Sequence, residues 1–576
     1  MNNPKADNQL NLALDATMAE RDKSMDLNVG YDPADRQWDL IVKYSGSPDG
    51  LKPYVVAITP LLNQYAVVRI LQSRIDEFVQ LPQVEYVEKP KRLFFTLYQA
   101  LAVSGIQSVK GPPLNLSGKG ILIACVDSGL DYRHMDFRNA DGSTRLIALW
   151  DQTVPGNPPE GYFLGTEYTK EQIDKNLSEN TLPLSTDFSG HGTAVMGIAA
   201  GNGQESDRVY EGVAPESDLL MVKLGTPLPE SFPRTTELIQ AIDYCIRKAI
   251  ERNQPLALNL SFGSSYGSRE GNSLLETYLD QVSNLGRIVI CVGMGNEGRS
   301  AGHTNVVLEK GSQVEIELTV GGYQPSFSLQ MWKNYVDDVA VQLVNPTGET
   351  IQLTSGTNAT GSQSASRFRL GNTQVLFYYG VPSPYSLAQE LYLDFLPTEN
   401  YIDEGIWIIR LIPSSIVDGS IDFYLPGGGT INEDTRFLTP TPERTLTIPA
   451  AANSVIAVGA YDSRLNSYAN FSGRGYTRET NLVKPDLAAP GVDIQTPKSG
   501  GGYAAVTGTS FATPFVTGSA ALMMEWGIIK GNDPYLYGEA VKANLRKGAR
   551  HLPGITQWPN PELGYGVLYL RDSLPV

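Results

Sequence analysis

The sequence predicts an α/β protein built on a doubly wound parallel sheet, with a small α+β unit before this sheet and an all-β unit inserted into it. Five short segments are mostly apolar, which is typical of parallel strands buried on both faces. They span residues 121–126, 219–222, 256–259, 287–292 and 454–458. Helical periodicity over residues 237–251 and 272–285 predicts helices that connect these strands. A run of alternating segments in the middle of the chain predicts the all-β unit.

The length of 576 residues predicts more than one domain. We expect three: residues 1–99, a discontinuous domain of residues 100–304 and 441–576, and an insertion of residues 305–440. In the first domain, strand patterns occupy residues 38–44, 65–70 and 84–88, and a helical pattern occupies residues 74–81. This order predicts a small open-faced sandwich of helices on a sheet. Residues 1–30 are polar and predict a loose arm or a short helix.

The expected insertion is rich in segments that alternate apolar and polar residues. Turn residues separate these segments at short intervals, which predicts a β-sandwich or jelly roll. The expected strands are residues 313–320, 326–330, 339–344, 374–379, 391–395, 405–411 and 420–425. Such an insertion either shields and stiffens the protein or recognises a substrate, and the sequence leaves both roles open.

Composition argues against several classes of partner. The net charge of −17 argues against nucleic acid. No segment reaches the roughly 20 apolar residues of a membrane span, and the first residues lack the apolar core of a signal peptide. We therefore expect synthesis in the cytoplasm, followed by retention in the cell or release by a route without a standard signal peptide.

The cysteines and the acidic loops give no metal or disulfide framework. Cys125, Cys245 and Cys291 form an odd, sparse set, so we expect buried, unreactive thiols. A thiol nucleophile is the alternative, although none of the three has an evident histidine partner nearby in the sequence. The loop 139–142 contains Asn and Asp, but its spacing is too generic to assign calcium ligands. We predict no metal and no cofactor.

The stretch Gly508-Thr509-Ser510-Phe511-Ala512-Thr513-Pro514 reads as a tight turn that begins a buried helix. Pro514 is tolerated in a first helical turn because its missing N–H costs little there. Ser510 would then lie among unpaired backbone N–H groups at the positive end of the helix dipole. Such donors stabilise the oxyanion that forms when a serine attacks a carbonyl. Taken alone, Ser510 has the alternative of being a helix cap.

Two further residues complete a catalytic set. The strand 121–126 is followed directly by Asp127, and His191 stands between glycines at the start of a helix rich in small residues. Ser510 needs a base to take its proton, and His191 can be this base and later the acid for the leaving amine. Asp127 would hold the other ring nitrogen of His191 and stabilise the imidazolium. Open α/β sheets place such groups at the carboxyl ends of their strands.

An oxyanion donor is expected from the Gly-rich turn 293–298, which follows the strand 287–292. The side-chain amide of Asn296 and the backbone N–H of Ser510 would bind the developing negative charge. Without the other three groups, Asn296 would be read as an ordinary turn residue.

The order Asp127, His191, Ser510, in the motifs VDSGLD, GHGTAVMGIAAG and GTSFATP, resembles that of the subtilisin-like serine proteases. Further matches are GVAP at 212–215, NLSFG at 259–263 and KPDLAAPG at 484–491. The resemblance covers most of the discontinuous domain and implies a serine endopeptidase with a subtilisin-like sheet. It also implies that two segments wall the specificity pocket, namely Leu260, Ser261, Phe262 and Gly263, and Val292, Gly293 and Gly295.

The N-terminal unit resembles a subtilisin-type prodomain, which acts in that family as folding chaperone and inhibitor. The resemblance implies that an extended tail, residues 93–99, leads into the active-site cleft. We predict self-cleavage near Gln99–Ala100, and the prodomain is then a partner bound in cis or after cleavage. The alternative is an uncut linker between two domains.

The intact catalytic set, the attached prodomain and the inserted β unit are similar in architecture to the Csp proteases of spore-forming clostridia. This resemblance implies a restricted protein substrate, a cortex-lytic pro-enzyme of spore germination, and spore association. Two alternatives stay open: a general intracellular turnover protease, and a pseudoprotease or binding scaffold locked by its prodomain. The distance from His191 to Ser510, 319 residues, is roughly twice the usual gap in the family, and the inserted unit accounts for the excess.

Overall fold

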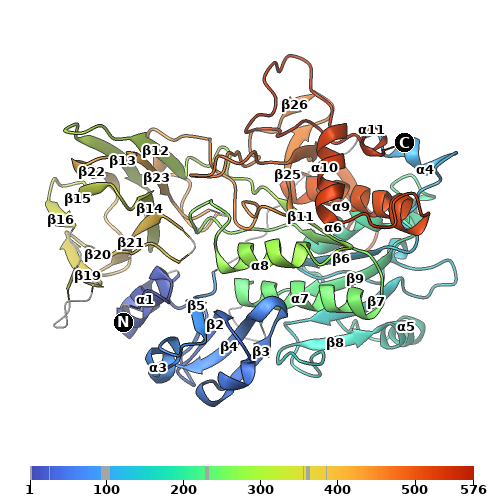
Figure 1. The fold of residues 1–576 in the computed structure, drawn as a ribbon, viewed down its shortest axis with the longest axis horizontal. Coiled ribbons are helices and arrows are strands. Elements are labelled where there is room, and N and C mark those ends of the chain that lie inside the picture. The colour runs from blue at the N-terminus through green and yellow to red at the C-terminus, as the bar shows by residue number, and fades with distance from the viewer. Residues whose placement is uncertain are drawn as a thin grey trace. The chain divides into compact units, whose positions relative to one another are not determined.

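The structure is a computed structural model that describes residues 3–24, 26–91, 104–226, 233–353, 356–357, 363–384, 386–427 and 429–575. Its contacts divide the chain into two compact units (Figure 1). Unit 1 comprises Met1–Arg92, Ser264–Leu274 and Arg299–Pro442. Unit 2 comprises Leu93–Gly263, Leu275–Gly298 and Glu443–Val576. The expected three-domain boundaries stay predictions.

Unit 2 is built on a nine-stranded, mostly parallel sheet. Its strands are β6 (Leu122–Asp127), β7 (Leu146–Asp151), β8 (Thr166–Thr169), β9 (Asp218–Lys223), β10 (Leu256–Leu260), β11 (Ile288–Gly293), β25 (Ile456–Asp462), β26 (Ser467–Tyr468) and β27 (Leu487–Pro490). The order is β26-β25-β11-β10-β6-β9-β7-β8, with β27 beside β25. Only β8 and β26 run antiparallel to their neighbours. The predicted doubly wound α/β fold is confirmed.

Helices cover this sheet because its strands are apolar on both faces. Alternate residues of β6, Ile123 and Cys125, share a core cluster with the helices α6 (His191–Ala200) and α9 (Thr509–Met524), while Leu122 and Ala124 face the other side. Both helices are buried along their whole length, as their small residues allow. The remaining helices of unit 2 are α4 (Gln107–Lys110), α5 (Lys170–Glu179), α7 (Thr235–Glu251), α8 (Leu274–Ser283), α10 (Gly538–Gly548) and α11 (Leu570–Ser573). A short hairpin joins β28 (Ile494–Pro497) to β29 (Tyr503–Val506).

A buried ion cluster beside β27 stabilises unit 2. The carboxylate of Asp486 is fully buried and lies 3.2 Å from Lys484 Nζ and 3.4 Å from Lys542 Nζ, and it also contacts the guanidinium of Arg546. The backbone N–H of Ala457, on β25, donates to it at 2.7 Å. Although burial opposes ionisation, the three cations and this donor hold the pKa of Asp486 far below its usual range.

The N-terminal part of unit 1 is an antiparallel sheet with short helices. Its strands are β1 (Tyr31–Asp32), β2 (Gln37–Tyr44), β3 (Ala57–Pro60), β4 (Tyr65–Leu71) and β5 (Val84–Glu88), in the order β1-β2-β4-β3, with β5 also beside β2. The helices are α1 (Asn8–Asp15), α2 (Met18–Lys23) and α3 (Ile75–Val79). Among the described residues before β1, the short-helix alternative holds rather than the loose arm, and Leu10 and Leu12 of α1 are buried.

The insertion consists of two antiparallel sheets. One has the order β12-β23-β14-β21-β20-β19, from strands β12 (His303–Val307), β14 (Phe327–Asn334), β19 (Ser366–Leu370), β20 (Thr373–Tyr379), β21 (Ala388–Pro397) and β23 (Ser420–Tyr424). The other has the order β16-β15-β22-β13-β24, from β13 (Val314–Val320), β15 (Asp338–Val344), β16 (Thr350–Leu353), β22 (Gly405–Ser415) and β24 (Arg436–Phe437). Side chains of both sheets share one core. The two-stranded pair β17 (Gly356–Thr357) and β18 (Gln363–Ser364) stands apart from these sheets. The predicted all-β insertion is confirmed.

The N-terminal part and the insertion share a second core within unit 1. Leu10 of α1 and Trp38 of β2 belong to the same cluster of buried residues as Tyr378 of β20 and Tyr392 of β21. Asn8 Nδ2 donates to the Glu390 carboxylate at 3.0 Å in the same region. These parts therefore belong to the same compact unit.

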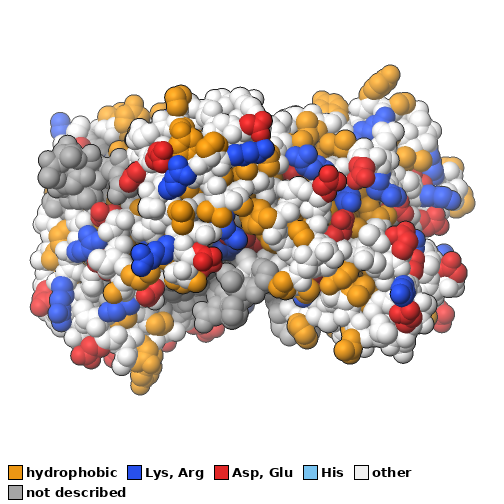
Figure 2. Space-filling view, turned by 90° about the horizontal axis from the view of Figure 1, so that it is seen from below, with side chains coloured by type: hydrophobic (Ala, Val, Ile, Leu, Met, Phe, Trp, Pro, Cys, Tyr) orange, Lys and Arg blue, Asp and Glu red, His pale blue; other side chains and the backbone are white. Residues whose placement is uncertain are grey.

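Acidic and basic groups are mixed on the face of the molecule drawn in Figure 2. On the face drawn in Figure 2, acidic and basic side chains alternate among scattered apolar ones, and no broad patch has one sign. Scattered apolar side chains of this kind are ordinary on folded proteins. In the part of the chain that the structure describes, no helix combines the length and apolarity needed to cross a membrane.

Unit 1 should lose stability as pH rises through neutrality. Burial raises the pKa of Asp7 to about 7, and Glu88 adds to this while Lys91 and Lys89 oppose it. In the unfolded chain this carboxyl ionises near pH 4, so between about pH 4 and 7 only the folded state holds the proton. The free energy of unfolding should therefore fall over this range, by up to about 1.4 kcal/mol per pH unit for this group.

The matched variant is Asp7→Asn, which keeps the side-chain oxygen that accepts from Leu10 N at 2.8 Å. Melting temperatures of both proteins between pH 5 and 8 check the prediction. The wild type should lose stability relative to the variant as pH rises. A constant difference over this range would contradict it.

Candidate active site

The predicted catalytic residues lie at the carboxyl edge of the parallel sheet of unit 2. Asp127 is the last residue of β6, and Ser261 and Asn296 follow the ends of β10 and β11. His191 and Ser510 are the first and second residues of α6 and α9. These five residues are far apart in the sequence, and the crossover connections of the fold bring them to one rim.

Asp127 and His191 are joined directly. Asp127 Oδ1 lies 2.6 Å from His191 Nδ1, and both side chains are fully buried. The same carboxylate oxygen accepts the backbone N–H of Ser128 at 2.7 Å. Because an ionised carboxylate only accepts hydrogen bonds, Nδ1 carries the ring proton in this pair. This tautomer makes Nε2 the basic nitrogen of His191.

The close approach of α6 to β6 depends on Gly192. A Cβ atom at this position would lie 2.2 Å from the carbonyl oxygen of Gly129 and 3.1 Å from Asp127 Cβ. Any side chain at residue 192 would therefore push the helix start away from Asp127. The glycine next to His191 is explained by this contact.

Ser510 is fixed by two hydrogen bonds with Ser261. Its hydroxyl donates to the carbonyl oxygen of Ser261 at 2.8 Å, and the Ser261 hydroxyl donates to the carbonyl oxygen of Ser510 at 2.7 Å. The adjacent Phe511 ring lies 5.2 Å from the His191 ring, centroid to centroid. Ser510 is 2% exposed. The structure thus brings the start of α9 beside both His191 and the end of β10.

Asn296 lies against the residue before Ser510. Its side-chain oxygen accepts the backbone N–H of Thr509 at 3.0 Å and the Thr509 hydroxyl at 3.1 Å. The N-cap residue Gly508 has φ 154° and ψ 163°, a region open almost only to glycine. A Cβ there would lie 3.4 Å from Asn296 Nδ2, so the absent side chain leaves the amide nitrogen close to the helix start.

The residues predicted to wall the pocket follow the ends of two neighbouring strands. The first wall begins with the last residue of β10, Leu260, and continues with Ser261, Phe262 and Gly263. The second wall begins with the last two residues of β11, Val292 and Gly293, and includes Gly295 just after the strand. β10 and β11 pair in parallel, with Leu260 opposite Val292. The walls therefore start side by side, and their role in binding stays a prediction.

Sequence reasoning missed the residue that shapes the loop before His191. Asp187 Oδ1 accepts from the hydroxyls of Ser128 and Ser189 and from Gly190 N, and Oδ2 accepts from the backbone N–H and hydroxyl of Thr193. One buried carboxylate thus ties the loop to both β6 and α6. The sequence signal was an aspartate four residues before the histidine, a position suited to a side-chain turn.

Several other expectations concern the same region. Gln99 and Ala100, the predicted self-cleavage residues, lie outside the described residues. The described residues contain no group of three or more His, Cys, Asp or Glu side chains that could hold a metal ion. Burial raises the pKa values of Cys125, Cys245 and Cys291, which disfavours a thiolate at each.

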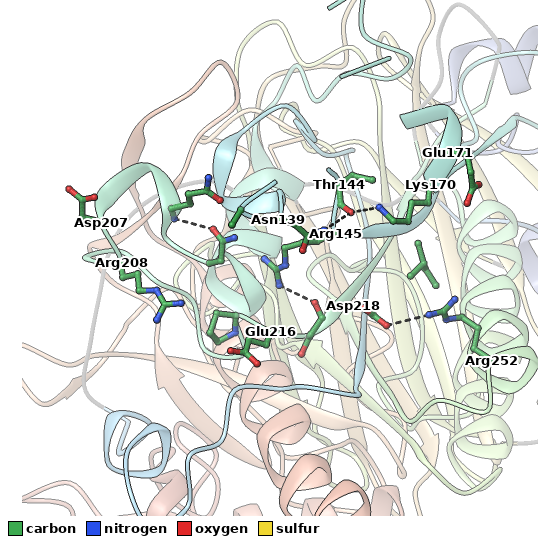
Figure 3. Close-up of a pocket in the computed structure, with 16 residues that line it drawn as sticks. Asn139, Thr144, Arg145, Lys170, Glu171, Asp207, Arg208, Glu216, Asp218 and Arg252 are labelled. Atoms are coloured by element: carbon green, nitrogen blue, oxygen red, sulfur yellow. Dashed lines mark hydrogen bonds and ion pairs between the residues drawn. The ribbon is translucent and has the colours of Figure 1, made fainter. Parts of the chain in front are cut away.

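A separate cavity of about 820 Å³ lies at the other edge of the sheet (Figure 3). Residues at the amino ends of β7 and β9 line it, including Asp218, the first residue of β9. Several of its charges have partners: Asp218 pairs with Arg252 at 3.3 Å, and Lys170 donates to the Thr144 carbonyl at 2.8 Å. Arg145 also donates to a backbone carbonyl, that of Ser217, at 3.0 Å. Because Asp127 stands at the carboxyl end of β6, this cavity is not part of the catalytic rim.

Models of two known protein families match this chain. The model of the subtilase family matches residues 118–380 and 432–566, which include Asp127, His191, Asn296 and Ser510. The chain belongs to the subtilase family of serine proteases. A second model, the Csp protease B prodomain, matches residues 4–91 of this subtilase.

Individual relatives agree with this assignment. A solved structure of the Clostridium perfringens CspB protease is 35% identical, covers 82% of this chain and 95% of that one, and has a TM-score of 0.73. The PII-type proteinase of Lactococcus lactis subsp. cremoris is 25% identical over 81% of this chain and 26% of the relative. The minor extracellular protease Vpr of Bacillus subtilis is 24% identical over 76% of this chain and 49% of the relative. The chain thus spans about a quarter to a half of these curated relatives.

Replacing Asn296 with Ala should lower kcat by about 10²- to 10³-fold, because one oxyanion donor is lost. KM should change little, since the donor acts mainly on the transition state. Steady-state kinetics on a peptide substrate check this. Thr509→Ser, which keeps the hydroxyl beside Asn296, is the control. A rise in KM with unchanged kcat would assign Asn296 to ground-state binding instead.

Proposed function

We propose that this subtilase is a serine endopeptidase that cuts its own chain after the prodomain and then cleaves a restricted protein substrate. The observation that carries the proposal is the 2.6 Å hydrogen bond between buried Asp127 and His191 at the rim where Ser510 begins α9. A binding scaffold has no need of a histidine held in this tautomer beside a serine.

The chemistry follows from these positions. Ser510 Oγ attacks the substrate carbonyl while its proton passes to His191 Nε2, and Asp127 stabilises the imidazolium that forms. The side-chain amide of Asn296 and the backbone N–H of Ser510 donate to the oxyanion. His191 then gives its proton to the leaving amine, and a water, activated by the same base, releases the acyl group.

Self-processing is supported by the prodomain match over residues 4–91, which ends shortly before the predicted bond between Gln99 and Ala100. Burial of α1 in the core of unit 1 gives the prodomain a folded form before any cleavage. The proposal is compatible with a prodomain that stays bound after cleavage and with a prodomain that is released.

The Ser510→Ala chain should stay at full length, since removing the nucleophile lowers kcat by about 10⁶-fold. Ser519→Ala is the matched control, because Ser519 is another buried serine of α9. The wild type and the control should both give two fragments. N-terminal sequencing and gel analysis of pure protein check this. Cutting of the Ser510→Ala chain at the same bond would refute the nucleophile assignment.

For the substrate, we propose a cortex-lytic pro-enzyme that is activated during spore germination. The 35% identity to the CspB protease over 95% of that chain supports this class. Cytoplasmic synthesis and later spore association belong to the same proposal. The alternatives are a general turnover protease and a prodomain-locked pseudoprotease, and both make different experimental predictions.

The processed enzyme should cleave such a pro-enzyme at one bond and leave unfolded casein largely intact. The physical reason is that a restricted protease gains its rate from several subsites at once, which an arbitrary unfolded chain fails to fill. Gel analysis and mass spectrometry of both digests check this. Broad digestion of casein would favour a turnover protease. Failure of a fluorophosphonate to label Ser510 after processing would favour a pseudoprotease.

A further inference from the structure

Asn259 places a polar side chain inside the apolar sheet of unit 2. It lies on β10 between Leu258 and Leu260, and its side chain is fully buried. A buried amide without hydrogen-bond partners costs free energy, so an apolar residue would be the default at this position. Packing within the sheet therefore does not explain this asparagine, and the explanation lies in its hydrogen bonds.

The Asn259 amide joins the middle of α9 to Ser261. The Thr517 hydroxyl of α9 donates to Asn259 Oδ1 at 2.9 Å, while its longer contact, 3.2 Å to the carbonyl oxygen of Thr513, stays within the helix. Asn259 Nδ2 donates to Ser261 Oγ at 2.7 Å. The Ser261 hydroxyl in turn donates to the carbonyl oxygen of Ser510 at 2.7 Å. Three hydrogen bonds in series thus connect α9 through β10 to Ser510.

The direction of these hydrogen bonds is set from the Ser510 end. A carbonyl oxygen only accepts, so the single proton of the Ser261 hydroxyl points at Ser510. Ser261 Oγ can then only accept from its other neighbour, and Asn259 Nδ2 is the donor that meets this need. Asn259 Oδ1 remains to accept from Thr517. A residue without an N–H at position 259 would leave the Ser261 hydroxyl able to rotate away from Ser510.

The Ser510 carbonyl needs this hydrogen bond because of Pro514. In an α-helix, each carbonyl oxygen accepts the backbone N–H of the residue four positions later. For Ser510 that residue is Pro514, which lies inside α9 and has no N–H. The Ser261 hydroxyl takes the place of the missing donor. The first turn of α9 is therefore tied to the end of β10 at Ser510 itself.

We propose that Asn259 is a positioning residue: through the Ser261 hydroxyl, it holds the backbone of Ser510 where Oγ can attack the substrate carbonyl. Asn259 is fully buried and two hydrogen bonds away from Ser510, so it touches no substrate. Loss of its N–H should slow the chemical step and leave substrate binding nearly unchanged. This inference rests on the proposed function, because it assigns a further residue to the same reaction.

The test is a double-mutant cycle on the processed enzyme with Asn259→Ala, Ser261→Ala and both together. Asn259→Ala should lower kcat on a peptide by about 10- to 100-fold, with KM within about twofold, because a small displacement of a reacting group has this effect. In the Ser261→Ala protein, the same substitution should change kcat by less than about twofold, since it acts through a hydroxyl that is already absent. Independent, multiplying effects would overturn the proposal.

Active-site counting separates positioning from folding. Complete labelling with a fluorophosphonate gives the number of active molecules, and kcat is expressed per labelled site. Fewer labelled sites with an unchanged kcat per site would assign Asn259 a structural role and overturn the proposal. Where a variant processes itself slowly, the rate at which its two fragments appear measures the same chemical step in a single turnover.

Thr517→Val is the milder second variant, because it keeps the shape of the side chain and removes only the donor to Asn259 Oδ1. It should lower kcat per site by about two- to fivefold in the wild type. It should have no further effect in the Asn259→Ala protein. An equal effect in both backgrounds would show that Thr517 does not act through Asn259, and this result would also overturn the proposal.

The wild type distinguishes failure of this inference from failure of the proposed function. A wild type that is labelled and cleaves the peptide, together with independent effects of the two substitutions, removes the role of Asn259 alone. A processed wild type that is neither labelled nor active removes the proposed function, and the role of Asn259 with it.

Discussion

The buried hydrogen bond between Asp127 and His191 is the constraint on which the rest of the catalytic rim depends. The start of α6 and the end of β6 must be close enough for these two side chains to lie 2.6 Å apart, and Gly192 permits this approach because it has no side chain. The parallel sheet then sets the remaining positions, because β10 and β11 end at the same edge as β6. Ser261 and Asn296 therefore reach the start of α9, where the Ser510 hydroxyl donates to Ser261 and the adjacent Phe511 ring lies against His191.

The sequence predicted the parts of this site that are local, and it missed those that depend on long-range packing. Apolar strands followed by Asp127 or by the turn of Asn296 are visible in the sequence, because each strand and its polar end are contiguous. Thr447, a buried residue after the insertion whose side chain packs against Gly263 and Gly295, gives no such signal, because the whole insertion separates it from Gly295 in the sequence. Asp187 lies near His191 in the sequence, but a single aspartate in a loop has too many ordinary roles.

The same limit explains the domain organisation. Alternation in the strands of the insertion and of the N-terminal sheet predicted which residues are buried, and the strands appear where expected. Alternation shows which face of a strand is buried, but it does not show which other part of the chain packs against that face. The polar composition around Leu10 of α1 predicted a loose arm or a short helix and did not indicate that Leu10 is buried in a core with Tyr378 of β20.

Buried carboxylates behave in opposite ways in the two units, and the difference lies in their partners. Asp486 in unit 2 is surrounded by three cations, which hold its pKa low and keep it ionised over the whole neutral range. In unit 1, burial raises the pKa of Glu390, and burial together with the neighbouring Asp26 raises that of Asp394. Ionising these groups costs free energy that no nearby cation fully returns. Rising pH therefore weakens the core shared by prodomain and insertion. The ion cluster of the catalytic sheet is affected later, because burial lowers the pKa of Lys484 to about 8 and removes one of its cations only above that pH.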